Sequence, residues 1–125
     1  MKNGYNDKVY YITIQETVYI NEKEMISMAE KLVAKSDLMT SLYSKLKKEE
    51  AAFETSIRSM DRIIQQLPQA WEGQAAQAYV TQFNDLKPGF EKAKQTVGAI
   101  ARQMDDILKI YQRTETEIAR KLKSK

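Results

Sequence analysis

The stretch that decides the fold is residues 79–118, YVTQFNDLKPGFEKAKQTVGAIARQMDDILKIYQRTETEI. Within it, twelve positions spaced alternately by four and three residues are apolar or aromatic at all but one site: Tyr79, Phe83, Leu86, Phe90, Ala93, Val97, Ile100, Met104, Ile107, Tyr111, Thr114 and Ile118. A repeat of 3.5 residues predicts one long helix that packs at a shallow angle against other helices.

A second series with the same spacing precedes this one: Met25, Met28, Leu32, Lys35, Met39, Leu42, Leu46, Glu49, Phe53, Ser56, Met60, Ile63 and Leu67. Lys35, Glu49 and Ser56 interrupt it. Because Ser36 and Asp37 are residue types that cap helix starts, the series predicts either one helix or a shorter helix preceded by a separate turn. Apolar residues beside the series widen its face, which favours a bundle of more than two helices.

The two series are joined by LPQAWEGQ, residues 67–74. Pro68 cannot continue a helix, and Gly73 tolerates the backbone angles of a tight reversal. A short link between long helices predicts an antiparallel hairpin. We expect the first helix at about residues 21–67, the turn at 68–73 and the second helix at about 74–122.

Pro88 and Gly89 stand inside the second predicted helix. An interior proline costs a helix about 3 kcal/mol and a glycine about 1 kcal/mol. The apolar series nevertheless crosses both residues without losing its spacing. We therefore expect one helix kinked near residue 88, with a true break into two helices as the alternative.

Residues 1–20 form an N-terminal extension of different character. Tyr10, Ile12 and Ile14 alternate with period two, which is typical of a strand. The segment is interpreted as strand-like or extended, and an arm that clasps a partner or a disordered segment remain alternatives.

Composition excludes several classes of function. The 20 basic and 17 acidic residues are interspersed and give a net charge of only +3, so no nucleic-acid groove is expected. The chain has no histidine and no cysteine, which removes the usual nucleophiles, general bases and zinc ligands. We expect a non-enzymatic protein with no cofactor and no metal. No apolar stretch is long enough to span a membrane, and none resembles a cleaved signal peptide.

In a two-helix hairpin the apolar face of each helix packs against only one neighbouring helix. The apolar side chains at the edges of that face therefore remain exposed to water. Fully burying one of them is worth about 1.5–3 kcal/mol. Two hairpins packed antiparallel form a four-helix bundle that covers these flanks. The expected fold class is therefore all-α: a long antiparallel helical hairpin that dimerises into a four-helix bundle, as a homodimer or as half of a heterodimer.

The Trp71-Glu72-Gly73 turn between two long helices resembles the motif that names the WXG100 family. Tyr111 and Glu115 are similar to the C-terminal YxxxD/E export motif of that family, forty residues after the tryptophan. The stretch around Pro88 also resembles Gram-positive members. The resemblance covers about residues 28–125, and roughly 27 residues precede it.

The resemblance implies a substrate of bacterial type VII secretion, exported as a folded dimer without a cleaved signal peptide. The resemblance also implies a protein that is cytoplasmic before export and extracellular afterwards, with a role in virulence or interbacterial competition. The export signal has two parts, which are Trp71 with Gly73 and Tyr111 with Glu115. A membrane-bound FtsK-type ATPase is the expected receptor.

Two other functions fit the sequence. The extra N-terminal residues depart from the minimal family pattern, which suits a heterodimeric targeting partner of a toxin with an LXG-type helical domain. A generic helical adaptor or scaffold would share the two apolar series but would need neither the tryptophan turn nor the tail motif.

Overall fold

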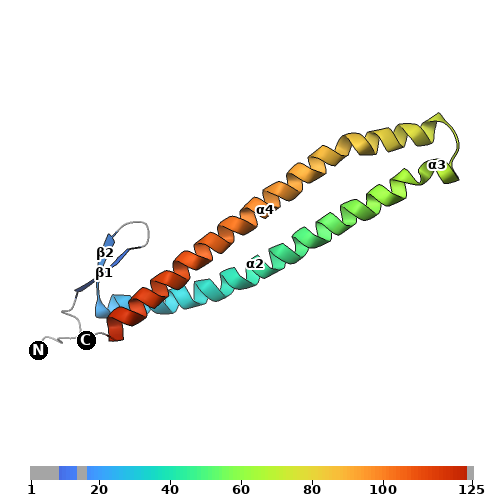
Figure 1. Cartoon of the computed structure of the whole chain (residues 1–125). Coiled ribbons are helices and arrows are strands. Elements are labelled where there is room, and N and C mark those ends of the chain that lie inside the picture. Colours follow the sequence, from blue (N-terminus) through green and yellow to red (C-terminus); the bar gives the residue numbers. More distant parts are fainter. Residues whose placement is uncertain (1–8, 14–16, 124–125) are drawn as a thin grey trace, which may run out of the picture. The chain divides into compact units, whose positions relative to one another are not determined.

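The computed structural model describes the backbone of residues 9–13 and 17–123, and the side chains from Tyr19 to Lys123. Along the chain the elements are strands β1 (Val9–Thr13) and β2 (Thr17–Asn21), then helices α2 (Glu22–Gln65), α3 (Leu67–Ala70) and α4 (Gln74–Lys123), as labelled in Figure 1. Two long helices that pack against each other confirm the prediction of an all-α helical hairpin.

The chain divides into two compact units. One contains residues Met1–Tyr43 with Gln103–Lys125, and the other contains Ser44–Arg102. Each unit therefore includes one part of α2 and one part of α4. We call them the terminal unit and the turn unit.

The terminal unit begins with a β-hairpin. Strands β1 and β2 pair antiparallel, with Val9 opposite Asn21 and Thr13 opposite Thr17. Helix α2 follows directly because the Asn21 side chain caps it: the Glu24 backbone N–H donates to Asn21 Oδ1 at 2.8 Å. Glu22 and Glu24 add negative charge at the positive end of the helix dipole.

The core of the terminal unit joins strand β2 to both long helices. Ile20, Met25, Leu32 and Ile118 are buried, and Met28, Ala29, Tyr111 and Leu122 pack against them partly buried. Met25 and Ile118 are fully buried. The strand-like extension thus contributes Ile20 to the hydrophobic core.

In the turn unit the two helices meet along a narrow line of small and apolar side chains. Ala76, Val80, Phe83 and Ala101 of α4 are buried. The Phe83 and Phe90 rings contact each other at 5.8 Å between centroids, with a tilt of 51°. Polar pairs flank this line: Lys87 Nζ lies 2.8 Å from Asp61 Oδ1, and Gln65 Nε2 donates to Asn84 Oδ1 at 2.8 Å.

Each long helix is continuous through the residues at which the sequence allowed a break. Helix α2 has 44 residues and passes through Ser36. Helix α4 has 50 residues and contains Pro88 in its interior. Phe83 is buried near Pro88, and the neighbouring Lys87 pairs with Asp61 of α2, so tertiary contacts override intrinsic propensity here.

Candidate functional site

The turn between the helices is built by Pro68 and Gly73. Pro68 stands in the first turn of α3, where a missing N–H costs nothing. The Trp71 backbone N–H then donates to the Leu67 carbonyl at 2.8 Å and ends this short helix. Gly73 has a φ of 113°, and α4 begins at the next residue. A side chain strongly disfavours that backbone angle, which explains glycine at the last position of the motif.

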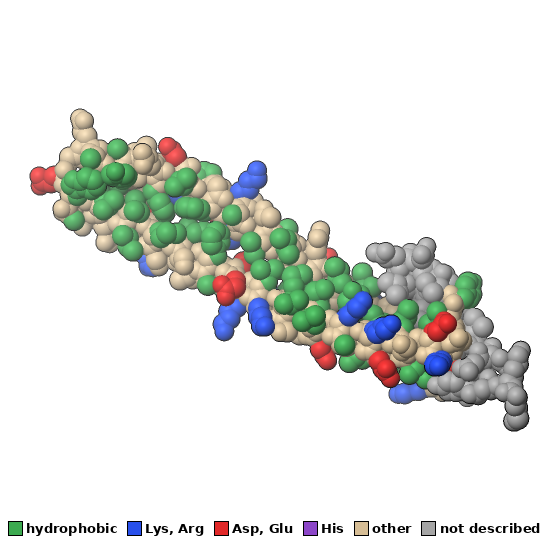
Figure 2. Space-filling view, turned by 180° about the vertical axis from the view of Figure 1, so that it is seen from behind, with side chains coloured by type: hydrophobic (Ala, Val, Ile, Leu, Met, Phe, Trp, Pro, Cys, Tyr) green, Lys and Arg blue, Asp and Glu red, His purple; other side chains and the backbone are tan. Residues whose placement is uncertain are grey.

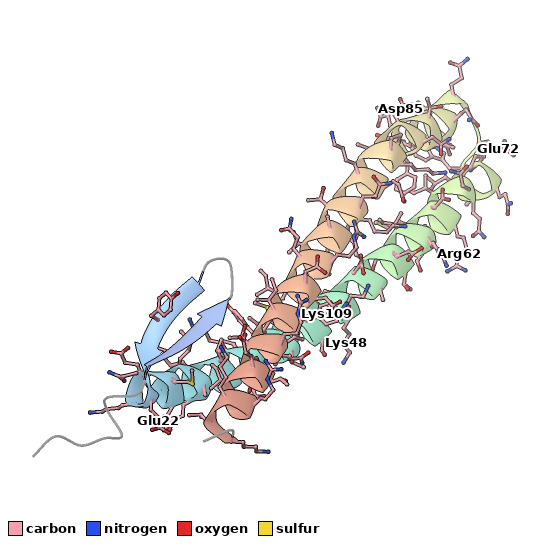
Figure 3. All side chains as sticks on the ribbon, turned by 60° about the vertical axis from the view of Figure 1, so that its left-hand side comes forward. Glu22, Lys48, Arg62, Glu72, Asp85 and Lys109 are labelled. Carbon is pink, nitrogen blue, oxygen red and sulfur yellow. The ribbon has the colours of Figure 1, made fainter. Side chains whose placement is uncertain are left out.

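Trp71 lies on the surface of this turn. Its side chain is 43% exposed, and its ring contacts Tyr79 at 5.6 Å between centroids with a tilt of 33°. Tyr79 is itself 52% exposed. The neighbouring Glu72 is exposed at the same turn, as Figure 3 shows. Two large aromatic rings that are open to water at one tight turn form a surface suited to a partner protein.

Tyr111 belongs to the terminal unit, where it is half-buried against the hydrophobic core. Beside it lies a hollow of about 440 Å³, whose apolar lining includes Ile20, Met28, Leu32 and Tyr111. Lys31 and Lys35 also line the hollow. Tyr111 is thus part of the core and part of the wall of an accessible hollow.

Glu115 stands one helical turn after Tyr111 and accepts a hydrogen bond from Ser36, which the sequence predicts only as a possible helix cap. Ser36 Oγ on α2 donates a hydrogen bond to Glu115 Oε2 at 3.2 Å. Ser36 is buried, with 7% of its surface exposed. Its position four residues after the buried Leu32 predicts burial on the same side of α2, but it does not identify Glu115 as the partner. Ser36 therefore positions the Glu115 carboxylate.

The structure thus forms two separate pairs from the four predicted site residues. Trp71 and Gly73 share one turn in the turn unit, and Tyr111 and Glu115 lie on neighbouring turns of α4 in the terminal unit. In the first pair, Gly73 allows the backbone angle of the turn and Trp71 is exposed on its surface. The second pair is set by packing and by the hydrogen bond from Ser36.

Large apolar side chains remain on the surface of the turn unit. Seven of them are at least one third exposed: Phe53, Met60, Ile63, Trp71, Tyr79, Leu86 and Ile100. Figure 2 shows many hydrophobic side chains on the surface of the turn unit, toward the upper left of that view. Only some residues of the two apolar series are therefore buried within the chain, and the others remain exposed.

The charged groups of the turn unit form exposed pairs. The Lys87 ammonium, with Gln65 as a second donor, lowers the pKa of the Asp61 carboxyl below its ordinary value of 3.8. Lys94 lies between Glu91 and Glu54, and its hydrogen bond to Glu91 raises the pKa of its ammonium. Such exposed pairs set local geometry and contribute little to stability.

Within the described residues, no group of three or more acidic side chains is arranged to hold a metal ion. Helices long and apolar enough to cross a membrane are likewise absent from the described part of the chain.

The WXG100 family model, described as proteins of 100 residues with WXG, matches residues 23–116. The YukE protein of Bacillus subtilis (strain 168) is 28% identical over 64 residues, which is 51% of this chain and 66% of that protein, just under two thirds of its length. No solved structure matches. The chain belongs to the WXG100 family, and its β-hairpin precedes the matched residues.

Proposed function

We propose that this chain is a non-enzymatic substrate of a type VII secretion system that leaves the cell as a folded dimer of helical hairpins. Membership in the WXG100 family, whose members are secreted proteins, supports the secretion route. The observation that carries the proposal is the exposed Trp71 at a turn whose backbone angle at position 73 favours glycine. An internal role alone would favour a buried tryptophan.

Pairing follows from the apolar side chains on the surface of the turn unit. Family members typically form dimers with related proteins. Packing a second hairpin over Leu86, Ile100 and their neighbours would remove these side chains from water, at about 25 cal/mol per Å² of apolar area. We expect the folded dimer to be the form that the exporter engages.

In this proposal the export signal has two parts. Trp71 and Gly73 present one part at the turn. Tyr111 and Glu115 present the other on α4, where Ser36 fixes the carboxylate. A membrane-bound FtsK-type ATPase reads both parts, which makes recognition dependent on the folded chain and not on a linear peptide alone.

A secretion assay in the producing bacterium tests the proposal. The chain is expected in the medium of wild-type cells and absent from the medium of cells that lack the export ATPase. Trp71→Ala and Glu115→Gln are expected to reduce the secreted fraction at least tenfold while the intracellular amount and the helical circular dichroism stay unchanged. Equal secretion with and without the ATPase would refute the export role.

Ser36→Ala provides the matched control for Glu115. It removes the hydrogen bond and leaves the carboxylate in place, whereas Glu115→Gln removes the charge but keeps a side-chain oxygen that can still accept from Ser36 Oγ. If the exporter reads the carboxylate, Ser36→Ala reduces secretion much less than Glu115→Gln does. If Glu115 serves only to hold α2 against α4 through this hydrogen bond, Ser36→Ala reduces secretion at least as much as Glu115→Gln does, and Glu115 is not part of the signal.

A further inference from the structure

The hollow of the terminal unit, of about 440 Å³, is lined by residues of strand β2 and of helices α2 and α4. Its floor is apolar: Ile20 and Leu32 are buried in the core, and Met28 and Tyr111 are partly buried beside them. The volume lies within the range of about 300–1,000 Å³ that is usual for small-molecule sites in proteins. An accessible apolar floor of this size is a candidate binding site.

One side of the hollow carries positive charge. Lys31 and Lys35 of α2 line it, and both are exposed. They stand four residues apart, so their side chains are neighbours on the surface of the helix. Two like charges at this spacing repel each other and destabilise a helix. An anion held between the two lysines would remove that repulsion.

No acidic side chain compensates these two lysines along α2. The residues three and four positions before and after each of them are Ser, Met, Ala, Leu or the other lysine. Neither lysine forms an ion pair with any residue between Tyr19 and Lys123. By contrast, four other lysines of the long helices pair with a carboxylate about one turn away: Lys47, Lys94, Lys109 and Lys121. The two lysines beside the hollow lack such a partner.

The negative charge of the hollow stands away from the lysines. Glu24 lies in the first turn of α2, where a carboxylate interacts favourably with the positive end of the helix dipole. It is seven residues before Lys31, which corresponds to about 10 Å along the helix. The exposed Ser27 lies between them. A ligand with one negative group would therefore place that group at the lysines and not at Glu24.

The size of the hollow fits one extended chain. At roughly 30 Å³ for each non-hydrogen atom, the share that a water molecule takes in the liquid, the hollow holds about 15 such atoms. Dodecanoate, a fatty acid anion, is of this size, and a phospholipid with two chains is too large. Two turns of an α-helix about 10 Å wide would occupy more than about 800 Å³, so a helix of a partner protein does not fit either.

We infer that the hollow of the terminal unit binds a single-chain fatty acid anion, with its carboxylate at Lys31 and Lys35 and its chain on the apolar floor. The two lysines select a negative head group, because hydrogen bonds between charged groups are the strong ones. The chain contributes through the apolar area that it removes from water. This binding goes beyond the proposed export role and does not depend on it.

Titration calorimetry of the full chain with dodecanoate, below the concentration at which it forms micelles, tests the inference. Saturable binding of one dodecanoate per chain is expected. Dodecyltrimethylammonium has the same chain and a positive head group, and butanoate has the same head group and a short chain. Each of these two probes is expected to bind at least tenfold more weakly, because the first is repelled by the lysines and the second makes little apolar contact.

A double variant locates the head group. Lys31→Gln with Lys35→Gln removes both charges at exposed positions, and it is expected to weaken dodecanoate binding at least tenfold without loss of helicity. The matched control is Lys45→Gln with Lys48→Gln, which removes the same charge from exposed positions of α2 in the turn unit; Lys48 is labelled in Figure 3. Neither control lysine lines the hollow, so the affinity should stay unchanged.

Trp71 reports whether the amphiphile binds elsewhere. It is the only tryptophan of the chain, and it lies in the turn unit, where other apolar side chains are also exposed. These side chains offer an amphiphile a second, less specific surface. If dodecanoate binds in the hollow, it saturates the chain without changing the fluorescence of Trp71.

The absence of saturable dodecanoate binding, equal binding of dodecyltrimethylammonium, or equal weakening by the two double variants would overturn the inference. A change in Trp71 fluorescence that follows the calorimetric titration would also overturn it, because the amphiphile would then lie on the turn unit. All of these outcomes leave the proposed export role standing, since that role is tested by secretion with and without the ATPase.

Discussion

The backbone at Gly73 can be tested by adding a single methyl group. Gly73 has a φ of 113°, and a Cβ at this position meets no atom within 4 Å. Gly73→Ala therefore creates no clash with the rest of the protein. Its whole effect on the folded state comes from the backbone angle, which separates conformational strain from lost packing.

The magnitude follows from two opposing contributions. A residue with a Cβ at such a positive φ costs about 1–3 kcal/mol in the folded state. Alanine also restricts the unfolded chain, which returns about 0.4–1 kcal/mol. The expected loss in the free energy of unfolding is thus about 1–2 kcal/mol, a substantial part of the roughly 5–15 kcal/mol that stabilises an ordinary domain.

Urea denaturation followed by helical circular dichroism measures this loss, with every variant at the same protein concentration. Glu72→Ala is the matched control, because it changes the neighbouring exposed residue without changing the backbone requirement; its effect should stay within about 0.5 kcal/mol. Gly73→Asn should fall between wild type and Gly73→Ala, since asparagine tolerates positive φ better. Unchanged stability of Gly73→Ala would refute the argument from backbone strain.

Two further predictions concern the packing and charge of the units. Ile118→Ala, at a fully buried position, should cost about 2–5 kcal/mol, whereas Ile63→Ala, at a position 63% exposed, should cost less than about 1 kcal/mol in dilute solution; similar urea midpoints would contradict this contrast. Lys87 and Gln65 lower the pKa of Asp61, so the ion pair between Lys87 and Asp61 stabilises the fold above the ordinary carboxyl pKa of 3.8. This contribution is lost as the pH falls below that value and Asp61 takes up a proton. The difference in urea midpoint between wild type and Lys87→Met should therefore shrink as the pH falls through this range, and a constant difference would show that the Lys87 ammonium does not act through Asp61.

The helical hairpin was predictable because its signals are local and strong. The repeat of 3.5 residues specified two helices, and Pro68 with Gly73 marked the reversal between them. The same repeat was less informative about burial. It grouped Leu86 and Ile100, which are about half exposed, with Phe83, which is buried. It also omitted Val80 and Ala101, which are buried. A periodic apolar pattern identifies an amphipathic helix. It does not identify the part of the helix surface that is buried within the same chain.

The candidate site shows the same limit. Trp71, Gly73, Tyr111 and Glu115 were selected from sequence motifs, and those motifs remain the basis of their proposed role. Ser36 could not be selected in this way, because its contact with Glu115 joins residues 79 positions apart in the chain. Hydrogen bonds of this kind arise only when two helices adopt one particular rotation.

The sequence by itself determined that the chain forms two long helices and a sharp turn, because helix periodicity, proline and glycine act within a few residues. Only the tertiary structure decided which side chains each helix buries and that strand β2 adds Ile20 to the core. It also decided that Leu86 and Ile100 of α4 remain exposed. These features depend on how each helix is rotated against its neighbour. That rotation is fixed by the sum of many contacts between residues distant in the chain.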